Sequence, residues 1–185
     1  MKVTGLRITT YEHLMSRRMG DANSPSGRDM ASTCIVEITT DEDLEGIAIG
    51  GGGAIPQIRS MFDSLILGED PRHVKGLWQR MIDRAFKSGN SGIITDAISV
   101  IDIALWDLKA KIANMPLYQL LGGKSRSGVM VYGHANGDSI EETVEEVGKY
   151  LDAGYHAVRA QTGIPGLKST YGVSKDKMFY EPADS

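Results

Sequence analysis

Three residues in the second half of the sequence carry side chains that could take part in binding or acid–base chemistry: His134, Arg159 and Tyr171. An imidazole can donate a hydrogen bond to a hydroxyl or a carboxylate. A guanidinium stays charged at neutral pH, whereas a free phenol titrates at about pH 10 and is a poor base. Taken one at a time, the three also have ordinary interpretations: a satisfied loop histidine, a surface or ion-paired arginine and a loop aromatic.

The elements that must position these residues form a strand–helix–strand pattern. Val129–Tyr132 is a short apolar run that predicts a strand, and Ala157–Ala160 predicts a second one. Ser139–Leu151 between them has the spacing of an amphipathic helix. A unit of this kind implies a parallel pair of strands. The histidine then follows the first strand, the arginine lies on the second, and the tyrosine lies in the segment after it.

The N-terminal quarter of the sequence predicts β-structure. Val3–Tyr11, Ser32–Thr40 and Leu44–Ile49 are rich in β-branched residues and predict a three-stranded antiparallel meander. The polar stretch Ser16–Met30 contains Gly, Ser and Pro and predicts a loop. Gly50–Gly53 is too rich in glycine to continue the third strand.

The middle of the sequence predicts helices. Apolar spacing indicates one helix from Pro56 to Ile66 and a longer one over about Ile94–Ala113. Between them, Asp70 and Pro71 predict the N-cap and the first position of another helix. Leu117–Leu121 predicts one further turn. The whole chain is thus an α+β domain, a meander with a helical bundle, followed by the start of a parallel α/β domain.

Composition restricts the class of function. The chain has 185 residues, with 41% hydrophobic and 24% charged, which is typical of a soluble globular protein. The net charge is −4 and the 20 Lys and Arg are scattered, so no nucleic-acid partner is expected. No apolar run approaches the roughly 20 residues of a membrane span, and no signal-peptide core follows Met1, so a cytoplasmic protein is expected. The single cysteine, Cys34, lies in an apolar run and predicts a buried structural thiol.

Three segments together resemble one family. IDIALWDLKAK at 101–111, with MPLYQLLGG at 115–123, resembles the last helix of the capping domain in the mandelate racemase branch of the enolase superfamily. VYGHANG at 131–137 resembles the end of the first barrel strand in acid-sugar dehydratases of the mannonate dehydratase type. RAQTGIPGLKSTYGV at 159–173 resembles the long loop after the second barrel strand in the same enzymes. The resemblance implies a capping domain over 1–121 and a truncated TIM-type (β/α) barrel over 122–185. From the residues alone, the helix would simply be packed, with Trp106 buried and Asp102, Asp107 and Lys109 solvated.

The resemblance also implies a chemistry. In that family the strand arginine and the loop tyrosine form the pair that removes the proton next to the substrate carboxylate, and these roles fall on Arg159 and Tyr171. A guanidinium held close to a phenol favours the phenolate and so lowers its pKa. His134 would bind the substrate. The ligands of the catalytic Mg²⁺ and the general acid are expected beyond Ser185, so no metal ligand is expected in this chain. The implied reaction is the dehydration of D-mannonate to 2-keto-3-deoxy-gluconate by a homo-oligomer, with the 185-residue chain alone inactive.

Two departures leave alternatives open. Where the family has a substrate-binding Asn after the third strand, this sequence has Gly50–Gly53 and Ala54 in a shorter connection. The segment Ser16–Met30 is also longer and more polar than the family pattern. The alternatives are another acid-sugar dehydratase of the same branch, such as a gluconate-type enzyme, and a non-catalytic relative that binds sugar acids or serves regulation.

Overall fold

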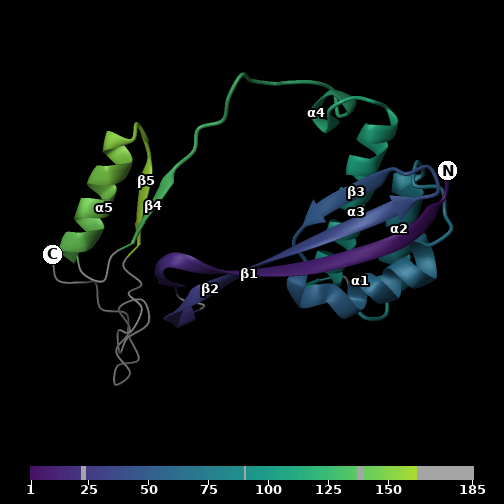
Figure 1. Ribbon diagram of the computed structural model, residues 1–185, viewed down its shortest axis with the longest axis horizontal. Helices are drawn as coiled ribbons and strands as arrows, with labels where there is room; N and C mark the ends of the chain where they lie inside the picture. The colour runs from purple at the N-terminus through teal and green to yellow at the C-terminus, as the bar shows by residue number, and fades with distance from the viewer. Residues whose placement is uncertain (22–23, 90, 137–139, 162–185) are drawn as a thin grey trace. The chain divides into compact units, whose positions relative to one another are not determined.

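A computed structural model describes residues 1–21, 24–89, 91–136 and 140–161 (Figure 1). The chain divides into two compact units, one containing residues 1–12 and 32–125, the other containing 13–31 and the residues from 126 onward. In chain order the elements are β1 (Val3–Asp21), β2 (Ser24–Thr40), β3 (Glu45–Ile49), the 3-10 turn η1 (Gly52–Ala54), α1 (Ile55–Met61), the π-helical turn η2 (Phe62–Ile66), α2 (Val74–Ala85), α3 (Ile93–Ile112), α4 (Leu117–Leu120), β4 (Gly133–Asn136), α5 (Ile140–Asp152) and β5 (Val158–Gln161).

The first unit is built on the predicted three-stranded sheet, with strand order β1-β2-β3. β2 and β3 run antiparallel, in register from Ile35 opposite Ile49 to Thr39 opposite Glu45. β1 pairs with the other side of β2, where the Arg7 guanidinium binds the carboxylate of Glu37. That contact lowers the pKa of the Glu37 carboxyl. The expected α+β fold with an antiparallel meander is confirmed.

Helix α3 packs against one face of this sheet, and α1 and α2 pack against α3 (Figure 1). Alternate residues of β2 turn inward, so Cys34, Val36 and Ile38 are buried. Cys34 is thus the buried thiol that its surroundings predict. α3 supplies the longest buried stripe, because its apolar residues recur at helical spacing. Its buried positions are Ala97, Ile98, Val100, Ile101, Ala104, Leu105, Leu108 and Ala110.

The helix bounds agree with the predictions within a few residues, except at the start of α2. Asp70 does not cap it, because the helix begins at Val74, after His73. Instead Asp70 accepts a hydrogen bond from the backbone N–H of Arg72 at 3.0 Å and pairs with the guanidinium of the same residue. An aspartate can bond to the backbone two residues further on, which favours a turn over a helix.

The predicted loop at Ser16–Met30 is wrong. β1 continues to Asp21 and β2 begins at Ser24, so the described residues of this stretch are strand. A long hairpin satisfies its backbone groups by pairing its two arms with each other, and this does not require an apolar sequence. Composition alone therefore misleads at this position.

A second correction concerns the polar residues of helix α3. Asp102 and Asp107 are half-buried rather than solvated. Burial raises the pKa of the Asp102 carboxyl, and Asp107 Oδ2 accepts a hydrogen bond from the backbone N–H of Ile47 on β3 at 2.9 Å. Trp106 is only partly buried, and Lys109 lies over its ring at 5.3 Å from the centroid.

The second unit contains the predicted strand–helix–strand arrangement. β4 and β5 are parallel neighbours, and α5 contacts both strands. The start of a β/α domain after the α+β domain is therefore present. Within the described part of the chain, no helix is long and apolar enough to cross a membrane.

Candidate functional site

Two of the three predicted site residues lie side by side. In the parallel pair of β4 and β5, His134 is the direct partner of Arg159. Directly paired residues of neighbouring strands place their side chains on the same face of a sheet. His134 is half-buried and Arg159 is exposed. An imidazole and a guanidinium therefore share one face of the small sheet, an arrangement suited to an anionic, hydroxylated ligand.

The shared face is the one that points away from α5. Gly133 and Ala135, which alternate with His134 along β4, are buried. Tyr150 of α5 lies against Gly133, because a Cβ at that glycine would meet Tyr150 Cδ1 at 2.4 Å. Since side chains alternate along a strand, His134 points to the opposite side. In a TIM barrel the helices form the outer layer, so the face away from the helix is the face toward the barrel interior.

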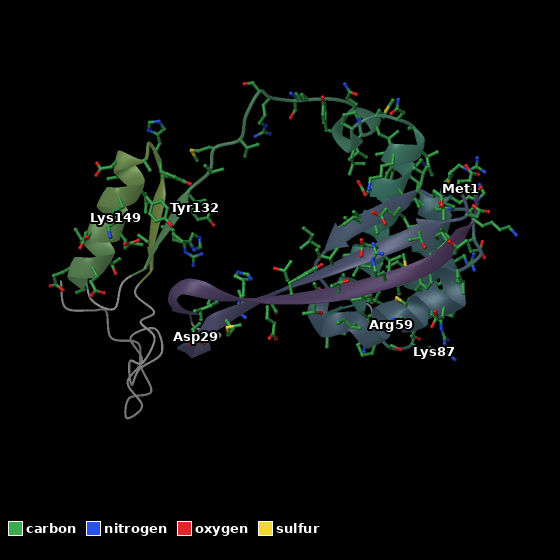
Figure 2. All side chains as sticks on the ribbon, viewed as in Figure 1. Met1, Asp29, Arg59, Lys87, Tyr132 and Lys149 are labelled. Carbon is green, nitrogen blue, oxygen red and sulfur yellow. The ribbon has the colours of Figure 1, made fainter. Side chains whose placement is uncertain are left out.

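Tyr132 belongs to the same face, and the sequence reasoning missed it. It precedes His134 by two residues, and the two rings have centroids 5.1 Å apart with planes tilted by 31°. Tyr132 as a residue is 55% exposed. In Figure 2 Tyr132 lies on the side of the strands away from α5, the helix that carries Lys149. The period-two spacing of the two aromatic rings was the signal that could have identified it.

The position of His134 relative to its strand differs from the prediction. Val129–Tyr132 was predicted as the strand and His134 as part of the following loop, but β4 spans Gly133–Asn136. The ladder begins where the N–H of Gly133 donates to the carbonyl of Ala157 at 3.1 Å. A glycine is favoured there because Tyr150 leaves no room for a side chain. His134 is consequently held by strand pairing.

Tyr171 lies outside the described residues, as do Glu181 and Asp184. The pairing of Tyr171 with Arg159 therefore remains a prediction. Among the residues that the structure describes, no group of three or more His, Cys, Asp or Glu is placed to hold a metal ion.

The glycine run after β3 has a structural cause. Gly50 and Gly51 have φ values of 133° and 71°, which favour glycine. A Cβ at Gly51 would also lie 2.9 Å from side-chain atoms of Ile58 and Val100. The turn thus packs directly on α1 and α3.

A cavity of about 370 Å³ lies near the amino ends of β4 and β5. Its lining combines Met130 and Val131, which precede β4, with the segment 153–156, which precedes β5. In TIM barrels the catalytic residues gather at the carboxyl ends of the strands, whereas the amino ends serve stability. We therefore do not assign the candidate site to this cavity, and the face that carries His134 and Arg159 remains the candidate.

Comparison with known proteins identifies the family of the chain. Residues 10–122 match the family described as mandelate racemase/muconate lactonizing enzyme, N-terminal domain. A D-mannonate dehydratase of Rhizorhabdus wittichii is 51% identical over 156 residues, covering 81% of this chain and 38% of that protein. A D-galactonate dehydratase family member of Marinomonas sp. is 48% identical over 166 residues, covering 86% of this chain and 40% of that protein.

Solved structures give the same result. The L-talarate/galactarate dehydratase of Salmonella typhimurium, solved with Mg and L-lyxarohydroxamate, matches with a TM-score of 0.73 and 25% identity, over 89% of this chain and 45% of that chain. The 3,6-anhydro-D-galactonate cycloisomerase of Zobellia galactanivorans matches with a TM-score of 0.68 and 30% identity, over 85% of this chain and 42% of that one. This chain spans about two fifths of the length of the curated relatives, 38% of the first. It belongs to the mandelate racemase/muconate lactonizing enzyme family of the enolase superfamily, and the match to that family's N-terminal domain is followed in this chain by a βαβ unit.

Proposed function

We propose that the protein of which this chain is a part dehydrates a sugar acid, and that the substrate is D-mannonate. The observation that carries the proposal is the direct pairing of His134 with Arg159 on the face of β4 and β5 away from α5. Five relatives named D-mannonate dehydratase, at 46 to 51% identity, support the choice of substrate. The product is 2-keto-3-deoxy-gluconate.

Each of the three predicted site residues has a role in this proposal. Arg159 holds a positive charge beside Tyr171 and so favours its phenolate form. Tyr171 then removes the proton from C2, next to the substrate carboxylate. His134 donates a hydrogen bond to the substrate from the neighbouring strand and fixes its orientation. Loss of the hydroxyl from C3 completes the dehydration, with help from an acid outside this chain.

Mg²⁺ is the proposed cofactor, with ligands located beyond Ser185. It supplies positive charge next to the substrate carboxylate. Two solved relatives carry Mg with a sugar-acid ligand or analogue, which supports this assignment. We further propose that 1–121 forms a capping domain and 122–185 the first part of the barrel, and that the whole protein is a cytoplasmic homo-oligomer.

A second candidate function is the dehydration of a different acid sugar. It is favoured by the glycine run at 50–53, where the family pattern has a substrate-binding asparagine. Relatives named as members of the D-galactonate dehydratase family, at 45 to 48% identity, are consistent with it. A third candidate is a non-catalytic protein that binds sugar acids.

One experiment separates these candidates. The full-length protein, with Mg²⁺, is offered D-mannonate, D-gluconate and D-galactonate, and the 2-keto-3-deoxy product is quantified for each. We expect the highest kcat/KM with D-mannonate, accompanied by deuterium exchange at C2 in D₂O. Faster turnover of D-gluconate or D-galactonate would transfer the assignment to the second candidate. Binding of a sugar acid without turnover or exchange would support the third.

A further inference from the structure

β3 is an edge strand of the sheet in the first unit. In the described part of the chain, the side of β3 that faces away from β2 has no neighbouring strand. The ladder with β2 shows which backbone groups face that edge. Thr40 donates to the carbonyl of Leu44, and Gly50 donates to the carbonyl of Cys34. Even-numbered residues of β3 therefore bond to β2, and the odd-numbered ones direct their N–H and C=O groups outward.

Two side chains of α3 bind these outward groups. Asp107 Oδ2 accepts a hydrogen bond from the N–H of Ile47 at 2.9 Å. Lys111 Nζ donates to the carbonyl of Glu45 at 2.8 Å. The same two side chains form an ion pair with each other at 2.8 Å, four residues apart on the helix. One donor and one acceptor of the strand edge are thus occupied by a mutually paired acid and base.

Close contact of the helix with the strand holds this arrangement in place. A Cβ at Gly46 would lie 2.0 Å from the carbonyl oxygen of Ala104, so α3 and β3 touch backbone to backbone. At that distance the side chains one and two turns further along α3 can reach around the strand to its edge. Gly46 on β3 therefore permits the close approach that lets Asp107 and Lys111 of α3 reach the strand edge.

We propose that Asp107 and Lys111 close the free edge of β3 against strand addition by a second copy of this chain. An open edge is a template for pairing with another chain, and charged side chains placed on it prevent this because a new strand would have to displace and desolvate them. This role lies outside the proposed dehydration and does not depend on it.

A second copy fits the edge well once the charged pair is removed. Antiparallel self-pairing centred on Ile47 would place Ile47 opposite its own copy and Glu45 opposite Ile49 of the other chain. Ile49 is 70% exposed and Ile47 is 36% exposed, so apolar surface is available. The pairing brings no like charges opposite each other, which makes β3 its own complementary partner.

The test replaces Asp107 with Leu and Lys111 with Met in the 185-residue chain, a change that leaves the net charge unaltered. At dilutions where the variant is monomeric, we expect the amide of Ile47 to exchange with solvent at least about tenfold faster, because it loses its acceptor. We also expect a concentration-dependent increase in mass by light scattering, relative to the parent chain. Asp83→Leu with Lys87→Met is the matched control, an acid and a lysine at the same spacing and away from the sheet, and should change neither measurement.

Two further variants keep the outcome decisive. Asp107→Asn retains a side-chain oxygen acceptor and should keep the Ile47 amide protected, even if the double variant folds poorly. Adding Ile47→Pro to the double variant removes the outward N–H that a second strand would use, and should abolish the association. If the double variant keeps the parent mass up to about millimolar concentration with an unchanged Ile47 amide, the proposal is wrong. It is equally wrong if the association survives Ile47→Pro.

Discussion

Replacement of Gly46 by Ala tests how closely α3 packs on β3. The new Cβ would lie 2.0 Å from the carbonyl oxygen of Ala104 and 2.8 Å from the Cβ of Leu108, whereas ordinary contact begins at 3.4 Å. Neither obstacle can rotate away, because one is helix backbone and the other is the first carbon of a buried side chain. The strand and the helix must therefore separate by roughly 1 Å or more.

The size of the effect follows from two contributions. Forcing an extra methyl into a packed core costs about 1 to 3 kcal/mol. The separation also weakens the hydrogen bond from Ile47 to Asp107, and a bond of that kind contributes about 0.5 to 1.5 kcal/mol. We expect Gly46→Ala to lower the free energy of unfolding by about 2 to 4 kcal/mol. For a domain of roughly 100 residues, which is about the size of the first unit, that corresponds to a Tm lower by roughly 10 to 30 °C.

Gly76→Ala is the control, and it should change the free energy of unfolding in the opposite direction. Gly76 lies in α2, and no atom lies within 4 Å of a Cβ placed there. Alanine in place of a helical glycine stabilises by about 0.5 to 1 kcal/mol. The assay is urea unfolding followed by fluorescence, because the only two tryptophans, Trp78 and Trp106, both lie in helices of the first unit. If Gly46→Ala unfolds within about 0.5 kcal/mol of the parent chain, the range of an ordinary surface substitution, the packing argument is refuted.

Three further predictions concern the second unit. In the full-length protein, Tyr171→Phe should lower kcat about 10² to 10⁴-fold without loss of fold. Arg159→Lys should lower kcat by an intermediate factor. Near-parental turnover by the Tyr171→Phe variant would show that Tyr171 is not the base. The 185-residue chain alone should neither turn over D-mannonate nor bind Mg²⁺ at micromolar concentration, as calorimetry can establish. Gly133→Ala should raise KM by displacing His134, and Tyr150→Leu in the same chain should restore it; a parental KM in the single variant would contradict the packing of Tyr150 on β4.

Most of the fold could be predicted from the sequence, because periodicity reports burial directly. The apolar stripe along α3 and the β-branched composition of Ser32–Thr40 predicted a packed helix and a strand, and the structure contains both, with Cys34 buried on β2. The strand–helix–strand unit was predicted for the same reason, although its first strand was placed four residues too early. Val129–Tyr132 has the right composition, but the ladder begins where Tyr150 packs on Gly133, a long-range contact that no local pattern contains.

The remaining differences arise where polar groups decide the structure. The described residues within 16–30 belong to β1 and β2, which are hydrogen-bonded neighbours, and strand pairing satisfies backbone groups without an apolar sequence. Asp107 was predicted to be solvated because an acidic residue at the side of a helix usually is, yet its partner is a backbone N–H sixty residues away. Of the candidate site, the sequence located His134 and Arg159 but not their direct pairing, which depends on the register of two strands.

Because Cys34 is buried, the rate at which its thiol is labelled can report how often the sheet separates from the helices. Cys34 is the single thiol, and its side chain is 5% exposed on the inner face of β2. An alkylating reagent can therefore react only after the sheet has separated from the helices, so the labelling rate at high reagent concentration equals the opening rate. A cysteine introduced at an exposed site such as Lys87 would react in the closed state, and the two labels would differ in timescale within a single sample. The same thiol thus allows spectroscopic probes to be attached elsewhere without first removing a native cysteine.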